Sequence, residues 1–209
     1  MVGKYPFIKA VSIILRIIWF LQWIFLFVLI IITILIASNS TLIDLSKIKG
    51  FKVQFEKIEI QSNNSAKDIA PNEVYLSNGI GRLHIKNTDD TFIFFRLFSV
   101  FVDTLLYIFI IYLLQKIFSS LNAGSFFVRQ NGIYIKRIAY AVLGIALLPD
   151  FINYLINVYV TNALVIDGII FKARFDFDLR TTFLALLIFV IAKVFIKGAE
   201  LKEDHDLTI

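Results

Sequence analysis

Residues 17–37 read IIWFLQWIFLFVLIIITILIA, a stretch without a single charged side chain. An α-helix rises about 1.5 Å per residue and the hydrocarbon layer of a bilayer is about 30 Å thick, so a helix over this stretch crosses it. Lys4, Lys9 and Arg16 precede the stretch, as cations precede the apolar core of a signal peptide. The apolar run is too long for such a core and no small-residue cleavage site follows it, so we expect a retained membrane span at residues 13–37.

The rest of the chain predicts three more spans, at residues 92–114, 138–160 and 179–196. The whole sequence is 58% apolar and its mean hydropathy is +0.80. Asp103 interrupts the second segment and Asp150 the third, while Arg180 and Lys193 flank the fourth, where long cationic side chains can reach the headgroups. The sequence therefore predicts an all-α membrane protein, a bundle of four helices, with residues 1–209 forming one integral membrane domain.

The cations of the short loops predict the orientation of the spans. The segment 115–137 carries Lys116, Arg129, Lys136 and Arg137 and no acidic residue. Short loops rich in Lys and Arg stay on the cytoplasmic side. We therefore expect this loop, the N-terminus and the tail 197–209 in the cytoplasm, with the insertions 38–91 and 161–178 on the other side.

Both extracytoplasmic insertions carry strand signals. Apolar residues alternate over residues 51–55 and resume one position out of phase at Ile58 and Ile60, as in a strand with a bulge. Asn78-Gly79 and Asp167-Gly168 are favoured hairpin dipeptides, flanked by residues 74–76 and 83–86 and by residues 164–166 and 169–177. We expect strands of the 1–2 and 3–4 loops to pair into one small β element that rests on the helices.

Asp103 and Asp150 are the most informative polar residues of the predicted spans. An ionised carboxylate in lipid costs about 2.5–3.5 kcal/mol even on the mildest scale, so each should face protein or water. Arg96 lies seven residues before Asp103 on the same helical face, and an interaction between the two is expected. The third span adds a polar stripe at helical spacing, and the whole predicted cluster comprises Arg96, Asp103, Asp150, Asn153, Tyr154 and Asn157. Two interpretations stay open: a site for an ion, proton or small ligand, as in a transporter or channel, and a structural seam between helices.

No recognisable catalytic or metal-binding constellation occurs in the sequence. The chain has no cysteine, and its two histidines, His84 and His205, fall on opposite sides of the predicted membrane. There is no HExxH pair, no serine elbow and no P-loop. We therefore expect no enzyme, no cofactor, no metal site and no direct nucleic-acid partner.

The chain ends in GAELKEDHDLTI, residues 198–209, where acidic residues are followed by an apolar terminus. This ending resembles the domain of unknown function 2975 family, bacterial four-span membrane proteins that close with glycine, a spacer, leucine, acids and Asp-Leu-Thr-Ile or Asp-Leu-Thr-Val. Gly124-Ser125-Phe126 before the third span is similar to a second piece of the family pattern. The resemblance implies a bacterial inner-membrane protein, often encoded beside a small helix-turn-helix regulator.

The tail and the cytoplasmic loop together form a predicted interaction surface. Its residues are Lys116, Arg129, Lys136, Arg137, Glu200, Glu203, Asp204, Asp206, Leu207, Thr208 and Ile209. The tail either binds a cytoplasmic protein partner, such as a helix-turn-helix regulator, or folds back onto the cations of its own loop. The sequence thus predicts a non-enzymatic regulatory or sensory membrane protein acting through protein contacts, and whether it forms a homo-oligomer stays open.

Overall fold

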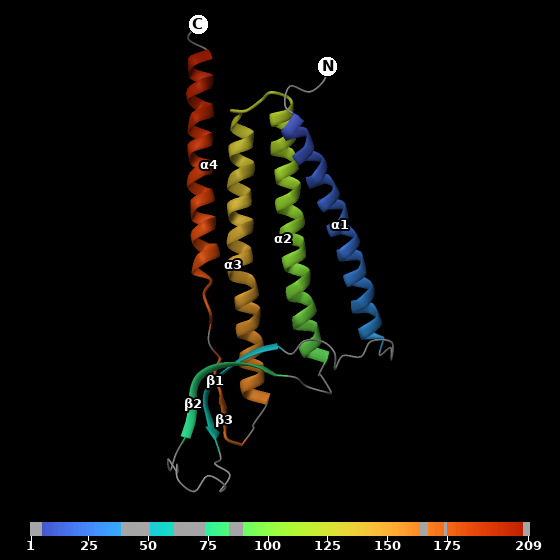
Figure 1. The fold of residues 1–209 in the computed structure, drawn as a ribbon, viewed down its shortest axis with the longest axis vertical. Helices are drawn as coiled ribbons and strands as arrows, with labels where there is room; N and C mark the ends of the chain where they lie inside the picture. The colour runs from blue at the N-terminus through green and yellow to red at the C-terminus, as the bar shows by residue number, and fades with distance from the viewer. Residues whose placement is uncertain are drawn as a thin grey trace. The chain divides into compact units, whose positions relative to one another are not determined.

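A computed structural model describes residues 6–38, 51–60, 74–83, 90–163, 167–173 and 175–206 of the chain (Figure 1). Most of these residues are helical, and a small sheet accompanies the helices. In chain order the elements are α1 (Pro6–Ala37), β1 (Phe51–Ile60), β2 (Val74–Leu83), α2 (Asp90–Asn122), α3 (Arg129–Ala163), β3 (Ile169–Phe171) and α4 (Leu179–Asp206).

Four of the described helices are long and apolar enough to cross a membrane. The qualifying segments are Pro6–Ile36, Leu97–Asn122, Arg129–Tyr159 and Leu179–His205. All four helices extend past the spans read from hydropathy, because an apolar run marks only the part suited to hydrocarbon and helical hydrogen bonding continues into polar residues. The segment predicted as the loop 115–137 is consequently helical except for residues 123–128, and the predicted tail is helical up to Asp206.

The chain divides into two compact units, a helix unit and a sheet unit. The helix unit comprises Met1–Ser38, Leu97–Pro149 and Phe177–Ile209, and the sheet unit comprises Asn39–Arg96 and Asp150–Asp176.

Contacts join successive helices of the helix unit. Gln115 Nε2 of α2 donates to the Leu15 carbonyl of α1 at 3.0 Å. A Cβ placed on Gly144 of α3 would lie 3.4 Å from Leu106 Cδ1 of α2, and one placed on Gly132 of α3 would lie 2.6 Å from Ile196 Cγ1 of α4. Small residues at such positions let helix backbones approach closely.

A hydrogen-bond network fixes the turn between α2 and α3. Gly124 adopts φ +83°, a left-handed conformation that ends α2 in the manner glycine favours. The side-chain amide of Asn131, which is 2% exposed, donates to Ser120 Oγ at 3.1 Å and to the Ser125 carbonyl at 3.2 Å. Ser120 Oγ itself donates to the Ser125 carbonyl at 3.0 Å. The start of α3 is thereby tied to the end of α2.

The sheet unit contains a three-stranded antiparallel sheet in the order β2-β1-β3. It pairs strands from both insertions, as the sequence predicts. The bulge expected in the first strand is also confirmed, because the register of β1 against β3 shifts between Phe55 and Lys57. Beyond Phe171, the backbone of Lys172 donates to the Gln54 carbonyl at 2.9 Å.

The prediction of a hairpin turn at Asn78-Gly79 is wrong. β2 runs through this dipeptide, with Gly79 paired to Phe55 and Ser77 to Lys57 of β1. A Cβ at Gly79 would collide with the Phe55 ring, so the strand needs glycine where this aromatic side chain crosses it. Asn78 has a positive φ of 53°, a conformation that Asn-Gly dipeptides also adopt in hairpin turns, but here the residue lies within the strand.

The strand predicted at residues 169–177 is shorter than expected. Gly168 has φ +78° and residues 167–168 form a turn, but the strand that follows covers only Ile169–Phe171 of the predicted 169–177. The alternation of phenylalanine and charge over 171–178 continues outside the sheet, because the chain leaves the edge of β1 to begin α4. Residues 164–166 lie outside the described residues.

The core of the sheet unit joins the sheet to helix α3. Val53 of β1 packs with Ile152 and Ile156 of α3, and all three are at most 5% exposed. Partly buried aromatic rings close this core: Phe95, Tyr159 and Phe171. Gln54 Nε2 donates to Asp176 Oδ2 at 2.7 Å, a hydrogen bond between residues far apart in the chain.

Candidate functional site

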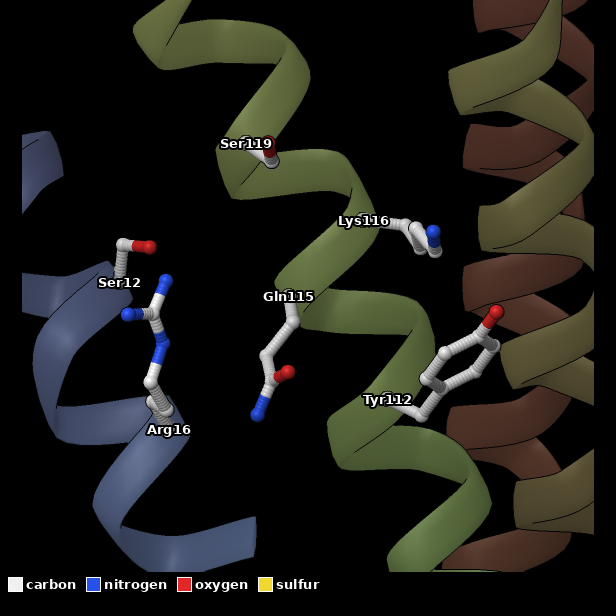
Figure 2. A pocket seen from close by; sticks show the side chains of 6 residues that line it. All are labelled: Ser12, Arg16, Tyr112, Gln115, Lys116 and Ser119. Carbon is white, nitrogen blue, oxygen red and sulfur yellow. The ribbon is translucent and has the colours of Figure 1, made fainter.

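A polar pocket of about 240 Å³ lies between α1 and α2 in the helix unit (Figure 2). The residues that line it are Ser12, Arg16, Tyr112, Gln115, Lys116 and Ser119. None of them is acidic, and two carry a positive charge. The pocket therefore offers an electropositive environment with several hydrogen-bond donors.

Helical spacing explains why these side chains meet. Positions three, four and seven apart lie on one face of a helix, which brings Tyr112, Gln115, Lys116 and Ser119 together on α2. Figure 2 shows Gln115 in the space between α1 and α2, while the side chains of Tyr112 and Lys116 extend from α2 on the side away from α1. Lys116 Nζ lies 5.5 Å from the centre of the Tyr112 ring, a cation–π distance.

On α1, Ser12 and Arg16 are one helical turn apart. Figure 2 shows the Ser12 hydroxyl directed toward α2 and the Arg16 side chain running alongside α1, so that its guanidinium lies near Ser12. The hydrogen bond from Gln115 Nε2 to the Leu15 carbonyl holds α1 and α2 together beside them. Gln115 uses one of its two amide N–H groups in this contact, so the donors that remain near the pocket are its second N–H, the guanidinium, the ammonium and the hydroxyl groups.

The pocket lies at one end of the apolar part of α1. Arg16 directly precedes the uncharged stretch 17–37, which at about 1.5 Å per residue is about 31 Å long. In a bilayer, a helix with these dimensions positions Arg16 at the boundary between hydrocarbon and headgroups.

Cations from all four helices lie near the level of the pocket. The contacts between neighbouring helices show which of their residues lie at the same height, and each further residue adds about 1.5 Å along a helix axis. On this basis, four cations lie within about one helical turn of each other along the helix axes. They are Arg16, Lys116, Lys136 and Lys193. Such a belt is typical of positions where long side chains reach the headgroups.

Between α3 and α4, this belt contacts aromatic rings. Lys136 Nζ lies 5.9 Å from the ring centres of both Tyr140 and Phe189, and Lys193 Nζ lies 5.7 Å from that of Phe189. Tyr140 and Phe189 pack edge to face at 5.9 Å. These two lysines therefore differ in environment from Arg16 and Lys116, although they lie at a similar level.

The predicted polar stripe of α3 belongs to the sheet unit. Asn157 is 5% exposed, while Asp150, Asn153 and Tyr154 are half-buried. The Tyr154 ring packs edge to face with Phe175 at 6.3 Å. The stripe thus shares its helix with the apolar core formed with β1.

Asp103 lies on α2 within the helix unit. Its Oδ1 atom is buried and has no hydrogen-bond partner among the described residues. Arg96 belongs to α2 within the sheet unit, and its side chain lies outside the described part. The expected interaction between Arg96 and Asp103 therefore stays a prediction.

The predicted cytoplasmic interaction surface is distributed over several elements of the helix unit. Lys116 lines the pocket, Lys136 contacts aromatic rings, and Arg129 begins α3. Glu200, half-buried, accepts a hydrogen bond and ion pair from Lys197 at 3.2 Å, one turn earlier in α4. Arg137 lies on α3, and the acidic residues Glu203, Asp204 and Asp206 lie on the last turns of α4. The remaining three residues lie outside the described residues: Leu207, Thr208 and Ile209.

Sequence reasoning missed the pocket. From the sequence, Arg16 is one of the cations that precede the first apolar stretch, Lys116 belongs to the predicted interaction surface, and no role is predicted for Ser12, Tyr112 or Ser119. The spacing on α2 is a usable signal, but only the pairing of α1 with α2 shows that Arg16 and Lys116 line one space.

The structure defines a class: a chain of four apolar helices of membrane-spanning length, joined to a three-stranded sheet contributed by two insertions. The family model described as "Protein of unknown function (DUF2975)" matches residues 75–209, and the chain belongs to this family. The matched region begins in β2 and includes α2, α3 and α4, so it contains the α2 side of the pocket. Comparisons with curated proteins and with solved structures gave no match.

Proposed function

We propose that the protein is a non-enzymatic regulatory or sensory protein of the bacterial cytoplasmic membrane that acts through protein contacts. In this proposal all four helices cross the bilayer, both termini lie in the cytoplasm, and the sheet lies on the opposite side. The four apolar helices support membrane insertion, and the basic residues near the pocket support the orientation.

The observation that carries the proposal is the core shared by the sheet and α3. Val53 of β1 packs directly on Ile152 and Ile156, so a displacement of the sheet alters the packing of α3, a helix of membrane-spanning length. A fold whose only task is to conduct a solute has no need of this coupling. A sensor requires it, because a contact made on one side must alter the protein on the other.

The end of α4 supports the second half of the proposal, a contact surface in the cytoplasm. Leu201 is 61% exposed, and Glu203 and Asp204 beside it are also exposed. An exposed leucine among acidic residues on a helix suits a partner with an apolar groove and basic rim.

Co-purification tests this proposal. The full chain and a variant lacking residues 206–209 are isolated from native membranes, with Lys193→Gln as a control that loses one charge on α4 outside the contact surface and keeps the terminus. We expect a cytoplasmic protein to co-purify with the full chain and the control and to be lost from the truncated variant. Recovery of the same proteins with all three would contradict a regulatory contact through the tail.

Transport is the second candidate, and it is favoured by the buried Oδ1 of Asp103, which has no hydrogen-bond partner within the described parts of the chain. Flux of ions or small solutes into vesicles distinguishes it from regulation. If Asp103→Asn or Asp150→Asn folds normally and abolishes a flux that the wild type supports, transport replaces the regulatory proposal. If the wild-type protein supports no flux above empty vesicles, the transport candidate is rejected.

A further inference from the structure

We propose that the pocket between α1 and α2 binds an anionic phosphate group. This inference does not depend on the regulatory role proposed above. It is based on the two cations of the pocket, on its hydroxyl groups and on its position along the helices.

The charge and donor set of the pocket fits a phosphate. Arg16 presents a planar guanidinium whose paired N–H groups match two phosphate oxygens, and Lys116 adds a point charge. The hydroxyl groups of Ser12 and Ser119 are further donors among the lining residues, while the Tyr112 hydroxyl extends to the side of α2 away from α1 (Figure 2). With two cations and no acidic lining residue, the pocket has a charge that a bound anion would neutralise.

The size of the pocket also selects the ligand. Pockets that enclose drug-sized molecules measure about 300–1,000 Å³, whereas this one measures about 240 Å³. It therefore accommodates a phosphate with a small substituent and leaves any long apolar chain outside, against the helices.

The position of the pocket indicates where such a phosphate comes from. Arg16 lies at the start of an apolar stretch as long as the hydrocarbon layer is thick, and phospholipid phosphates lie just beyond that layer. Basic pockets between membrane helices bind anionic headgroups in this way. A soluble phosphate or phosphate ester shares the same chemistry, so the experiment separates the two sources.

The experiment uses the purified full-length protein in a neutral detergent. Thermal unfolding is followed while phosphatidylglycerol, phosphatidylcholine or inorganic phosphate is added separately, and native mass spectrometry counts the lipids retained. We expect phosphatidylglycerol to raise the unfolding temperature and to be retained, and phosphatidylcholine to do neither. Stabilisation by inorganic phosphate without preference for phosphatidylglycerol would assign the pocket to a soluble phosphate. If none of the three ligands stabilises the wild-type protein, the proposal is overturned.

Variants then locate the binding. Arg16→Gln and Lys116→Gln each remove one pocket cation, and Lys193→Gln removes a cation at a similar level that contacts Phe189 instead. A hydrogen bond to a charged group contributes about 1.5–3 kcal/mol, so each pocket variant should bind about 10-fold to 100-fold more weakly. Lys193→Gln should bind as the wild type does.

A conservative variant separates recognition from charge alone. Arg16→Lys keeps the positive charge and loses the planar fork, so we expect binding between that of the wild type and that of Arg16→Gln. Circular dichroism confirms that each variant is folded before binding is measured. Equal loss in Arg16→Gln and Lys193→Gln would show that the anion responds to the belt of cations rather than to the pocket, and would also overturn the proposal.

Discussion

Replacing Gly132 by alanine tests the close packing of α3 against α4. A Cβ at this position would lie 2.6 Å from Ile196 Cγ1, 3.0 Å from Ile196 N and 3.3 Å from Ile196 Cα. The side-chain atom can move, but the two backbone atoms can yield only if α4 shifts. Gly132→Ala therefore forces apart the helices that this glycine holds close.

Two opposing contributions determine how much Gly132→Ala changes the free energy of unfolding. Alanine is favoured over glycine inside a helix by about 1 kcal/mol, and overpacking of a tight contact costs about 1–3 kcal/mol. Gly198 of α4 provides a matched control, because nothing lies within 4 Å of a Cβ placed there. Gly198→Ala keeps the propensity gain without the collision, so the free energy of unfolding of Gly132→Ala should lie about 1–3 kcal/mol below that of Gly198→Ala.

The assay is unfolding of the purified protein in detergent micelles, followed by circular dichroism as a denaturing detergent is added. A second variant, Ile196→Ala in the Gly132→Ala background, removes the Cγ1 contact and leaves the two backbone contacts, so it should restore part of the loss. If Gly132→Ala stabilises the protein as much as Gly198→Ala does, the close approach of α3 and α4 is refuted.

Three further substitutions test other contacts of the structure. Gln54→Ala removes the 2.7 Å hydrogen bond to the Asp176 carboxylate and should lower the free energy of unfolding by about 1.5–3 kcal/mol, measured by the same detergent titration. Asn131→Leu removes the side-chain donor to Ser120 Oγ and to the Ser125 carbonyl and should lower the free energy of unfolding by about 0.5–1.5 kcal/mol for each hydrogen bond lost, with faster exchange of the turn amides in the variant as the independent readout. A hydrogen bond from the Thr181 side chain holds the pKa of the Asp178 carboxyl below its ordinary value of 3.8. The carboxylate at the start of α4 therefore contributes stability above pH 3.8 that is lost as pH falls through the lowered pKa, and the difference in unfolding temperature between wild type and Asp178→Ala should shrink over that range.

Much of the fold could be predicted from the sequence because its signals are local. A helix over the uncharged residues 17–37 can be buried only in lipid or in a very large protein core. The alternation of apolar residues shifts by one position between residues 55 and 58, which indicates a bulge whatever the partner strand is. Both depend only on neighbours along the chain.

The prediction failed where a distant residue decides the structure. Asn78-Gly79 has the sequence of a turn, but the Phe55 ring on the neighbouring strand requires the glycine, and the dipeptide stays within β2. The predicted extent of the strand at residues 169–177 was also wrong, since the chain leaves the sheet after Phe171 to begin α4, although the residues that follow still alternate like a strand.

The pocket illustrates the same limit for the candidate site. Arg16 and Lys116 are a hundred residues apart in the sequence. Each by itself resembles an ordinary cation near the end of an apolar segment, where a long side chain reaches the headgroups. Only the hydrogen bond between Gln115 and the Leu15 carbonyl shows that the two helices bring these cations to one space. Hydropathy contains no information about which helices are neighbours.

Labelling of single cysteines tests the central claim, that the helices thread the membrane with the sheet on one side and the end of α4 on the other. The chain has no cysteine of its own, so Ser77→Cys in β2 and Lys202→Cys in α4, both exposed, introduce unique thiols. We predict that a membrane-impermeant maleimide added to intact cells labels Ser77→Cys at once and labels Lys202→Cys only after the membrane is opened. Labelling of both positions from the same side would contradict it.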